Sequence, residues 1–307
     1  MGTQDFNDLF MRETAPSTRS YFKVVGVGHY GSTIVSIMSM AGISGVDFAI
    51  VENNPIPMKC RMIDDNNIVD SNDPECEEKV CEIVGGDTMM LFVVSGMDED
   101  RCVPIMTSLC RQIHSYGDDN DNIVSLALVS IPSSGGKVDA KVQDRLSAIA
   151  QNATKVITFY REDEPCIQRM ELNEDEQQII DAINTICQLF QNHNFCFVDY
   201  NDVATILQSG NKAVFGAGTG CGEKRVAKAA SELIRDLEFD GNMIEDAKGI
   251  LLHIHFSPSH HLTFEECNTV IDILHHHMSK ESNVLYNFSD DMRGDRDTIL
   301  LNAIVIY

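Results

Sequence analysis

Basic residues are scarce in this chain relative to acidic ones. Lysine and arginine total 23 against 47 aspartates and glutamates, so the formal net charge is -24. Proteins bind the phosphate backbone of nucleic acids, and anionic lipid surfaces, through basic patches. The charge therefore argues against a nucleic-acid partner and against direct contact with a membrane.

Segments that would carry the chain into or across a bilayer are missing as well. No apolar run reaches the ~18 residues of a membrane span, and the first twenty residues lack the basic start and apolar core of a secretory signal. The ten cysteines include no Cys-x-x-Cys pair, and without an export signal we expect reduced thiols. We predict a cytoplasmic protein with no metal site and with a flexible polar arm at residues 1–20.

The first half of the chain alternates strand patterns with helical ones. Strands are predicted at residues 21–28, 46–52, 89–96, 122–132 and 155–161, with helices at 31–42, 103–114 and 141–153. Strands at this spacing, with helices between them, predict a parallel doubly wound sheet of the α/β class. Ligands of such sheets bind at the carboxyl ends of the strands. We therefore predict a nucleotide-binding-like, Rossmann-type domain over residues 21–170.

A long helix and a second α/β region are predicted for the other half. Apolar residues recur at spacings of three and four within residues 173–194, which gives a helix one buried face. We predict a central helix over residues 171–194 and a smaller α/β C-terminal domain over residues 195–307. Within that domain, the segment GAGTGCGEKR from Gly216 is predicted to form a glycine turn between a strand and a helix.

Three segments of the chain resemble, in the same order, the FtsZ family of bacterial tubulin relatives. They are FKVVGVGHYGSTIVSIMSMAGISGVDFAIVENN, CFVDYNDVATILQSGNKAVFGAGTGCGEKRVAKAA and AKGILLHIHFSPSHHLTFEE, at residues 22–54, 196–230 and 247–266. The resemblance implies a tubulin/FtsZ-like fold with a GTP-binding domain, a central helix and a C-terminal activation domain. It also implies head-to-tail filaments, in which one subunit's acidic loop completes the next subunit's nucleotide site.

The positions that the resemblance assigns to the nucleotide depart from the family's pattern. Its glycine loops are represented by Gly26, Gly28, Gly31 and Gly96. In the first loop, His29 and Tyr30 replace small residues and would crowd a phosphate that glycine amides otherwise approach. After Gly96 the family has a signature rich in glycine and threonine, whereas this chain has Asp98–Asp100 and a shorter loop. Carboxylates there would repel a triphosphate more strongly than one helix dipole attracts it.

Further nucleotide contacts of the family are replaced too. Ser133, Ser134 and Val138 stand where the family uses a phenylalanine, a glutamate and an arginine. Glu176 stands at the position of the asparagine that reads guanine, and a glutamate can still accept hydrogen bonds from that base. The resemblance implies GTP hydrolysis as the family activity. For this chain we expect no nucleotide or only weak GTP or GDP binding, Mg2+ only if a nucleotide binds, and no hydrolysis.

The acidic loop of the opposite subunit face is better preserved. Asp199 and Asp202 match the family's two catalytic aspartates, which polarise the attacking water at the neighbour's γ-phosphate. Phe197 replaces the asparagine of that loop. An aspartate just before a helix is also a common N-cap, so capping alone is an equally good interpretation of the pair.

The sequence thus predicts a divergent FtsZ-like protein of the cytoskeleton or of cell division, acting as a filament component or modulator. Its expected partners are itself or an ordinary FtsZ, through head-to-tail contacts. Because the chain ends at Tyr307, without the family's linker and tail, we do not expect a stand-alone ring. Two alternatives stay open: an active GTPase with atypical phosphate loops, and a non-polymerising binding module that uses the old cleft.

Overall fold

The computed structural model describes most of the chain, in two compact units. The described residues are 21–43, 45–53, 63–85, 87–115, 123–132, 139–161, 172–190, 198–238, 241–290, 292 and 297–307. One unit ends at Ile180, and the other runs from Asp181 to Tyr307. Several predictions fall outside the described residues: the arm at 1–20, the domain limits at 170/171 and 194/195, and Ser133, Ser134, Val138 and Phe197.

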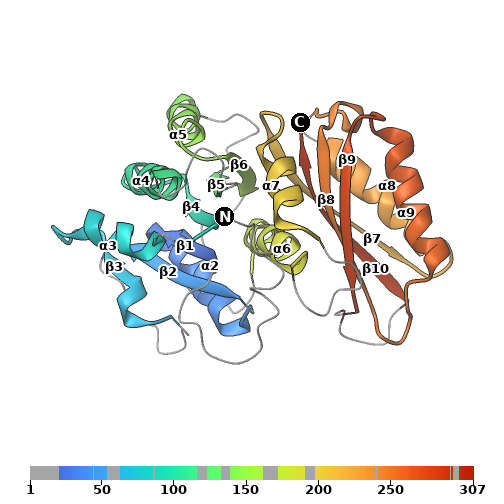
Figure 1. The fold of residues 1–307 in the computed structure, drawn as a ribbon, viewed down its shortest axis with the longest axis horizontal. Coiled ribbons are helices and arrows are strands. Elements are labelled where there is room, and N and C mark those ends of the chain that lie inside the picture. The colour runs from blue at the N-terminus through green and yellow to red at the C-terminus, as the bar shows by residue number, and fades with distance from the viewer. Residues whose placement is uncertain are drawn as a thin grey trace, which may run out of the picture. The chain divides into compact units, whose positions relative to one another are not determined.

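Six parallel strands form the sheet of the unit that ends at Ile180, in the order β3-β2-β1-β4-β5-β6 (Figure 1). They are β1 (Phe22–Val27), β2 (Val46–Glu52), β3 (Ile68–Asp70), β4 (Met90–Gly96), β5 (Val124–Pro132) and β6 (Lys155–Arg161). The predicted parallel doubly wound sheet is confirmed. The order reverses at β1, which pairs with both β2 and β4, and a ligand site is expected at their carboxyl ends.

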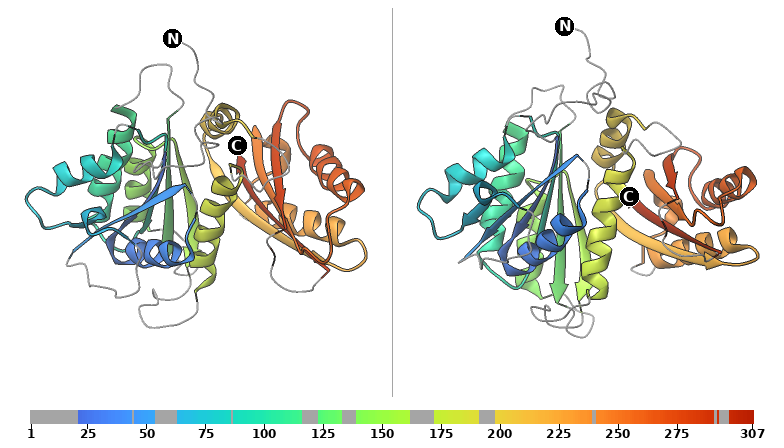
Figure 2. Two further views of the ribbon diagram at one scale, coloured as in Figure 1. Left: turned by 60° about the horizontal axis from the view of Figure 1, so that its bottom comes forward. Right: turned by 90° about the horizontal axis from the view of Figure 1, so that it is seen from below.

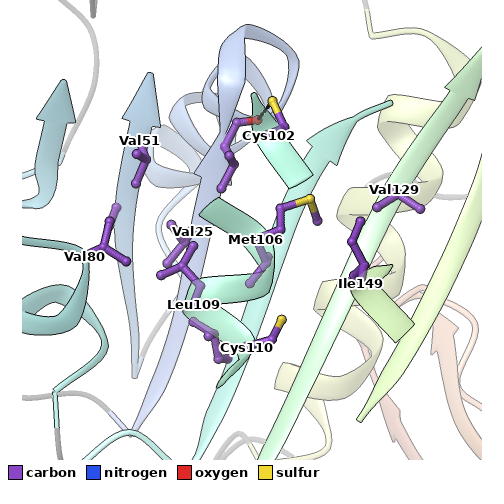
Figure 3. Packing of buried hydrophobic residues seen from close by; sticks show 14 of the residues in the cluster. Val25, Val51, Val80, Cys102, Met106, Leu109, Cys110, Val129 and Ile149 are labelled. Carbon is purple, nitrogen blue, oxygen red and sulfur yellow. Dashed lines mark hydrogen bonds between the residues drawn. The ribbon is translucent and has the colours of Figure 1, made fainter. Parts of the chain in front are cut away.

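Helices cover both faces of this sheet (Figure 2). They are α2 (Gly28–Ala41) on one face, and α3 (Cys76–Val84), α4 (Cys102–Ser115) and α5 (Ala140–Ala150) on the other, with a short turn η1 (Asp65–Asn67) before β3. Figure 3 shows the buried core of the second face, where Val25 and Val51 of the strands meet Val80 of α3 and Leu109 of α4. Successive strand residues point to opposite faces, so the neighbours of Val25 face α2.

The central helix is shorter than predicted. Helix α6 spans Glu174–Gln188, against the predicted 171–194, and the limit between the two units falls within it, after Ile180. Helix α7 (Tyr200–Gln208) follows. The sequence pattern also missed β3 and α3, since three residues are too few to show an alternation and the charged segment of α3 has little apolar content. No described helix has both the length and the apolar composition that crossing a bilayer would require.

The unit from Asp181 to Tyr307 contains a four-stranded mixed sheet in the order β7-β10-β8-β9. Its elements are β7 (Ala213–Cys221), α8 (Arg225–Glu238), η2 (Ile244–Asp246), β8 (Gly249–Phe256), α9 (Phe264–His277), β9 (Asn283–Ser289) and β10 (Thr298–Ile306). Helices α8 and α9 pack on one face through a common apolar core. The glycine turn predicted from Gly216 is wrong in extent, because β7 continues through the glycines to Cys221.

Candidate functional site

The predicted nucleotide-loop glycines lie together where β1 and β4 end. A Cβ added to Gly26 would come closer than 3.0 Å to the carbonyl oxygen of Gly31, and one on Gly31 equally close to that of Val94. Gly28 begins α2 with a φ of 70°, and its Cβ would lie 2.5 Å from the sulfur of Cys102. These glycines are therefore needed for α2 to start directly against the sheet. Their contact with a nucleotide stays a prediction.

The N-terminus of α2 is occupied by a carboxylate of the chain itself. The residue before the helix is Val27, whose side chain cannot cap it. Instead, the backbone N–H of His29 donates to Oε1 of Glu99 over 3.3 Å. The amides and the dipole at a helix N-terminus favour negative charge and commonly bind phosphate. Glu99 supplies such a charge at this helix end.

The other two acids of the same loop are paired with arginines. Nη2 of Arg161 lies 2.6 Å from Oδ2 of Asp98, and the Arg161 side chain is 3% exposed. Arg145 donates to Asp100 and to the carbonyl oxygen of Met97. The three carboxylates therefore do not all repel a triphosphate as expected, because Asp98 and Asp100 are paired with arginines of β6 and α5.

Tyr30 connects this corner to the first turn of α6. Its hydroxyl donates to Oδ2 of Asp175 over 2.5 Å, and the hydroxyl of Ser130 donates to the same oxygen over 2.7 Å. The guanidinium of Arg161 stacks 5.1 Å from the centre of the Tyr30 ring. Burial, together with the hydrogen bond to Asp175, raises the pKa of Tyr30, so the phenol stays a neutral donor. A side chain that the sequence analysis treated as an obstacle to phosphate is thus a buried structural link.

The rim of the site is held by polar contacts between neighbouring loops. Nδ1 of His29 lies 2.8 Å from a carboxylate oxygen of Glu52, at the end of β2. After β3, Asn72 bonds to Asn53 and accepts from Nη1 of Arg101 over 3.3 Å. The loops that follow β2, β3 and β4 are therefore joined by side chains of the chain itself.

Glu176, the possible base-reading position, serves as a helix cap. It is buried, and its carboxylate accepts the backbone N–H of Asn173 over 2.9 Å at the start of α6. One of its oxygens is thus engaged within the chain. Within the described ranges, no three histidine, cysteine, aspartate or glutamate side chains come together as a metal ion would require.

The two aspartates of the acidic loop lie at the N-terminus of α7. Oδ1 of Asp199 accepts the backbone N–H of Asn201 over 2.7 Å, so Asp199 is the N-cap. Asp202 lies one turn on and is exposed. The capping interpretation is confirmed for Asp199, and a catalytic role of either residue stays a prediction.

Sequence reasoning missed the groups that neutralise the corner. Arg145 and Arg161 lie on α5 and β6, and the two ion pairs join residues 45 and 63 positions apart. The one available signal was the acidic triplet itself, since adjacent carboxylates in a folded chain call for nearby cations. Which of the 23 basic residues would supply them was not visible in the sequence.

Comparison with protein families and curated proteins gives a consistent result. Residues 211–301 match the family model described as FtsZ family, C-terminal domain. The chain is similar to the cell division protein FtsZ of Pseudomonas aeruginosa, with 22% identity in an alignment of 290 positions that covers 85% of this chain and 71% of the relative. It is also similar to the cell division protein FtsZ 1 of Methanocaldococcus jannaschii, with 20% identity in an alignment of 321 positions that covers 94% of this chain and 85% of the relative.

Solved structures agree with this over nearly the whole chain. A mutant FtsZ of M. jannaschii superposes with a TM-score of 0.76 at 18% identity, covering 94% of this chain and 92% of that one. CetZ2 from Haloferax volcanii, solved as a protofilament with bound GTPγS, gives a TM-score of 0.64 at 15% identity, covering 92% of each chain. The fold is therefore tubulin/FtsZ-like.

Proposed function

Because the chain is a divergent member of the FtsZ family, we propose that it is an FtsZ-like cytoskeletal protein of cell division whose GTP binding is lost or weakened. One observation carries this proposal: Glu99 already occupies the amide at the N-terminus of α2. Helix N-termini at the carboxyl ends of parallel strands commonly bind phosphate. The chain thus fills the position with its own anion.

A triphosphate would have to displace this arrangement at a net cost. It would compete with Glu99 for the amide of His29, and it would separate Arg161 from Asp98 if it recruited that arginine. Separating Arg161 from Asp98, whose side chain is 38% exposed, costs about 1.5–3 kcal/mol, whereas one helix terminus contributes below ~2 kcal/mol. Asp98 would also be left as an unpaired charge beside the phosphates. These terms favour the internal contacts over a nucleotide.

Nucleotide content of the purified protein tests this part. We expect no guanine nucleotide to be released on denaturation, and no saturation in a GTP titration with magnesium. Replacing Asp98–Asp100 with glycines should still not produce micromolar affinity, because the loop is also shorter than the family's. Stoichiometric GDP in the wild-type protein would contradict the proposal and support the alternative of an active GTPase.

The second part of the proposal concerns filaments. Relatives have been solved as an FtsZ dimer and as a CetZ2 protofilament, which supports assembly with itself or with an ordinary FtsZ. Asp199 and Asp202 retain the family's acidic loop, so this chain can present that loop to a nucleotide held by another subunit. Head-to-tail interfaces are heterologous, and a subunit with one competent face ends growth rather than propagating it. The chain would then act as a filament modulator at substoichiometric amounts.

Mixing the protein with FtsZ from the same cell tests this role by light scattering and phosphate release. The matched control is Asp199→Asn with Asp202→Asn, because asparagine keeps the N-cap acceptor and removes the charge. We expect shorter filaments and altered turnover with the wild-type chain, and a much weaker effect with the double variant. Equal effects of both proteins would contradict the role of the acidic loop. No nucleotide and no effect on assembly would support the non-polymerising binding module.

A further inference from the structure

A cluster of polar side chains lies on the face of the four-stranded sheet that points away from α8 and α9. The even-numbered residues of β8 belong to the apolar core under those helices, so His253 and His255 point to the other face. In the sheet register, His253 is paired with Asn302 of β10 and with Asn287 of β9. Polar residues of three neighbouring strands therefore meet in one row.

These polar side chains are almost completely buried. His253 and Asn287 are 0% exposed, Asn302 is 3% exposed and His255 is 8% exposed. Burial of a polar group costs free energy unless a hydrogen bond or a metal ion compensates for the lost water. Both polar atoms of the Asn287 amide are hydrogen-bonded to backbone groups, at 3.3 and 2.8 Å. Oδ1 of Asn302, in contrast, has no hydrogen-bond partner in the part of the chain that the structure describes.

The distance between Asn302 and His255 fits two ligands of one ion better than it fits a hydrogen bond. Nε2 of His255 lies 3.5 Å from Nδ2 of Asn302, whereas hydrogen bonds between such groups are usually about 2.7–3.2 Å long. Two ligands that each lie about 2.1 Å from a tetrahedral Zn2+ are about 3.4 Å apart. A half-turn of the Asn302 amide brings its Oδ1 to the position that faces His255.

His253 supplies a third ligand, and a serine orients its ring. The ring centres of His253 and His255 are 4.5 Å apart, and two imidazoles on one tetrahedral ion have their centres about 5 Å apart. Nε2 of His253 lies 2.8 Å from Oγ of Ser289. A histidine that binds a metal commonly donates its other ring N–H to an oxygen in this way. When Nε2 is protonated toward Ser289, Nδ1 of His253 carries the lone pair.

We infer that His253, His255 and Asn302 form a binding site for a divalent transition-metal ion such as Zn2+. Two imidazole nitrogens and an amide oxygen suit such an ion, whereas Mg2+ and Ca2+ take oxygen ligands. All three ligands are neutral, and the net charge of -24 favours a cation. The third ligand is an amide, so the site does not need a third histidine, cysteine, aspartate or glutamate, which the described residues do not provide.

The site is independent of the nucleotide corner and was not expected from the sequence. All three ligands lie in the unit from Asp181 to Tyr307, on two strands of its sheet. Asn302 is 47 positions from His255, and no spacing rule connects an asparagine on one strand with histidines on another. The inference therefore stands or falls separately from the proposed loss of GTP binding.

A Zn2+ titration of the full-length protein tests the site. Exposed histidines at the end of α9 can bind the ion independently, so every protein tested carries the same three substitutions there, His275→Gln, His276→Gln and His277→Gln. Calorimetry measures the affinity and the stoichiometry. NMR of the imidazole nitrogens of His253 and His255 locates the ion, because binding at a cysteine elsewhere would leave these resonances unchanged.

Two substitutions of one ligand should move the affinity in opposite directions. The parent protein should bind one Zn2+ per chain and shift the ring nitrogens of both histidines. Asn302→Leu keeps the volume but removes the amide, and should weaken binding by about tenfold or more. Asn302→Asp should strengthen it by about tenfold or more, because a carboxylate adds a negative charge beside the ion. A gain of affinity cannot result from unfolding.

Three outcomes would overturn the inference. The first is the absence of saturable Zn2+ binding by the parent protein, and the second is saturation that leaves the resonances of His253 and His255 unshifted. The third is an affinity that does not rise from Asn302→Leu through the parent to Asn302→Asp. Should the leucine variant not fold, the comparison of Asn302→Asp with the parent decides alone.

Discussion

Two segments of this chain combine closely spaced glycines with a helix, and the structure uses them differently. In the first, Gly28 and Gly31 already belong to α2, so the helix begins at the end of the sheet and its first amides meet Glu99. In the second, the glycines lie inside β7, and α8 starts only at Arg225. The first segment creates an anion position at a helix end, and the second lays a helix along a strand.

Glycine spacing relative to the strand period explains the difference. Residues 216, 218 and 220 are two apart, so they clear a single face of the strand from residue 216 to residue 220. Gly26, Gly28 and Gly31 are two and three apart and clear the junction between two elements instead. A glycine motif thus predicts a phosphate-binding helix N-terminus only when its glycines lie on both sides of the junction between a strand and a helix. The experiments below test this contrast, beginning with the largest expected effect.

Adding a methyl group to β7 should destabilise the protein far more than adding one just after it. In Gly220→Ala the new Cβ would overlap the carbonyl oxygen of Arg225, and we expect a loss of about 3 kcal/mol or more. Gly222→Ala is the control, since its Cβ has open space but its φ of 65° is left-handed, which costs about 1–2 kcal/mol. Urea unfolding measures both. Equal losses would show that α8 does not rest on the strand.

Of the two buried arginines, Arg225 should contribute more to the free energy of unfolding than Arg161 does. Arg225 is bonded to two carboxylates, Glu266 and Asp297, and to two backbone carbonyls, so Arg225→Met should cost about 3–5 kcal/mol. Arg161 pairs with one carboxylate, Asp98, whose side chain is 38% exposed, and Arg161→Met should cost about 1.5–3 kcal/mol. Both values come from chemical denaturation. A larger loss at Arg161 would mean that the nucleotide corner is the more strongly held of the two segments.

The two units should lose stability in different pH windows. Burial lowers the pKa of His114 from its ordinary 6.5. As pH falls below 6.5, His114 is therefore protonated in the unfolded chain before it is protonated in the folded one, and the unit that ends at Ile180 loses stability. In the other unit, the hydrogen bond from Arg225 lowers the pKa of Glu266 from its ordinary 4.5. That stabilisation is present above 4.5 and is lost as pH falls further.

Hydrogen exchange from pH 7.5 to 4 follows each unit separately. His114→Gln should remove only the loss of stability below pH 6.5 in the unit that ends at Ile180. Glu266→Gln should remove only the loss below pH 4.5 in the other unit. Loss of stability of both units in one common step would contradict this separation.

The smallest effect is expected at the helix end itself. Glu99→Gln keeps an acceptor for the amide of His29 but removes the charge at the N-terminus of α2, which should cost about 0.3–1 kcal/mol. Thermal unfolding at low and high salt measures it, and the loss should shrink as salt screens the dipole. A loss that is independent of salt would assign the role of Glu99 to its contact with Cys102, whose Sγ lies 3.9 Å from Oε2 of Glu99.

The strands and helices of this protein were largely predictable from local patterns. The bounds predicted for β2 and β6 match the structure, because alternation and flanking polar residues are local properties of the sequence. Helix α2 begins at Gly28, three residues before its predicted start, because Gly28 was assigned to the end of the strand predicted at residues 21–28. Strand β7 extends through residues 216–220, which were predicted to form a turn. These glycines stay extended because α8 packs on them and β10 pairs with them, and neither contact is visible in the local sequence.

The sequence by itself determined the parallel sheet, the resemblance to FtsZ and the departure of its phosphate loops, since each depends on residues close together in the chain. Only the tertiary structure decided what the acidic triplet does. Its counter-charges, Arg145 and Arg161, are distant in sequence, and no periodicity or spacing marks them. The same holds for Glu232 and Asp236 of α8, whose carboxylates accept the N–H groups of Thr219 and Ala217 on β7 only after the helix has packed. Ion pairs and edge contacts join groups through space, so they follow from packing and cannot be seen in local composition.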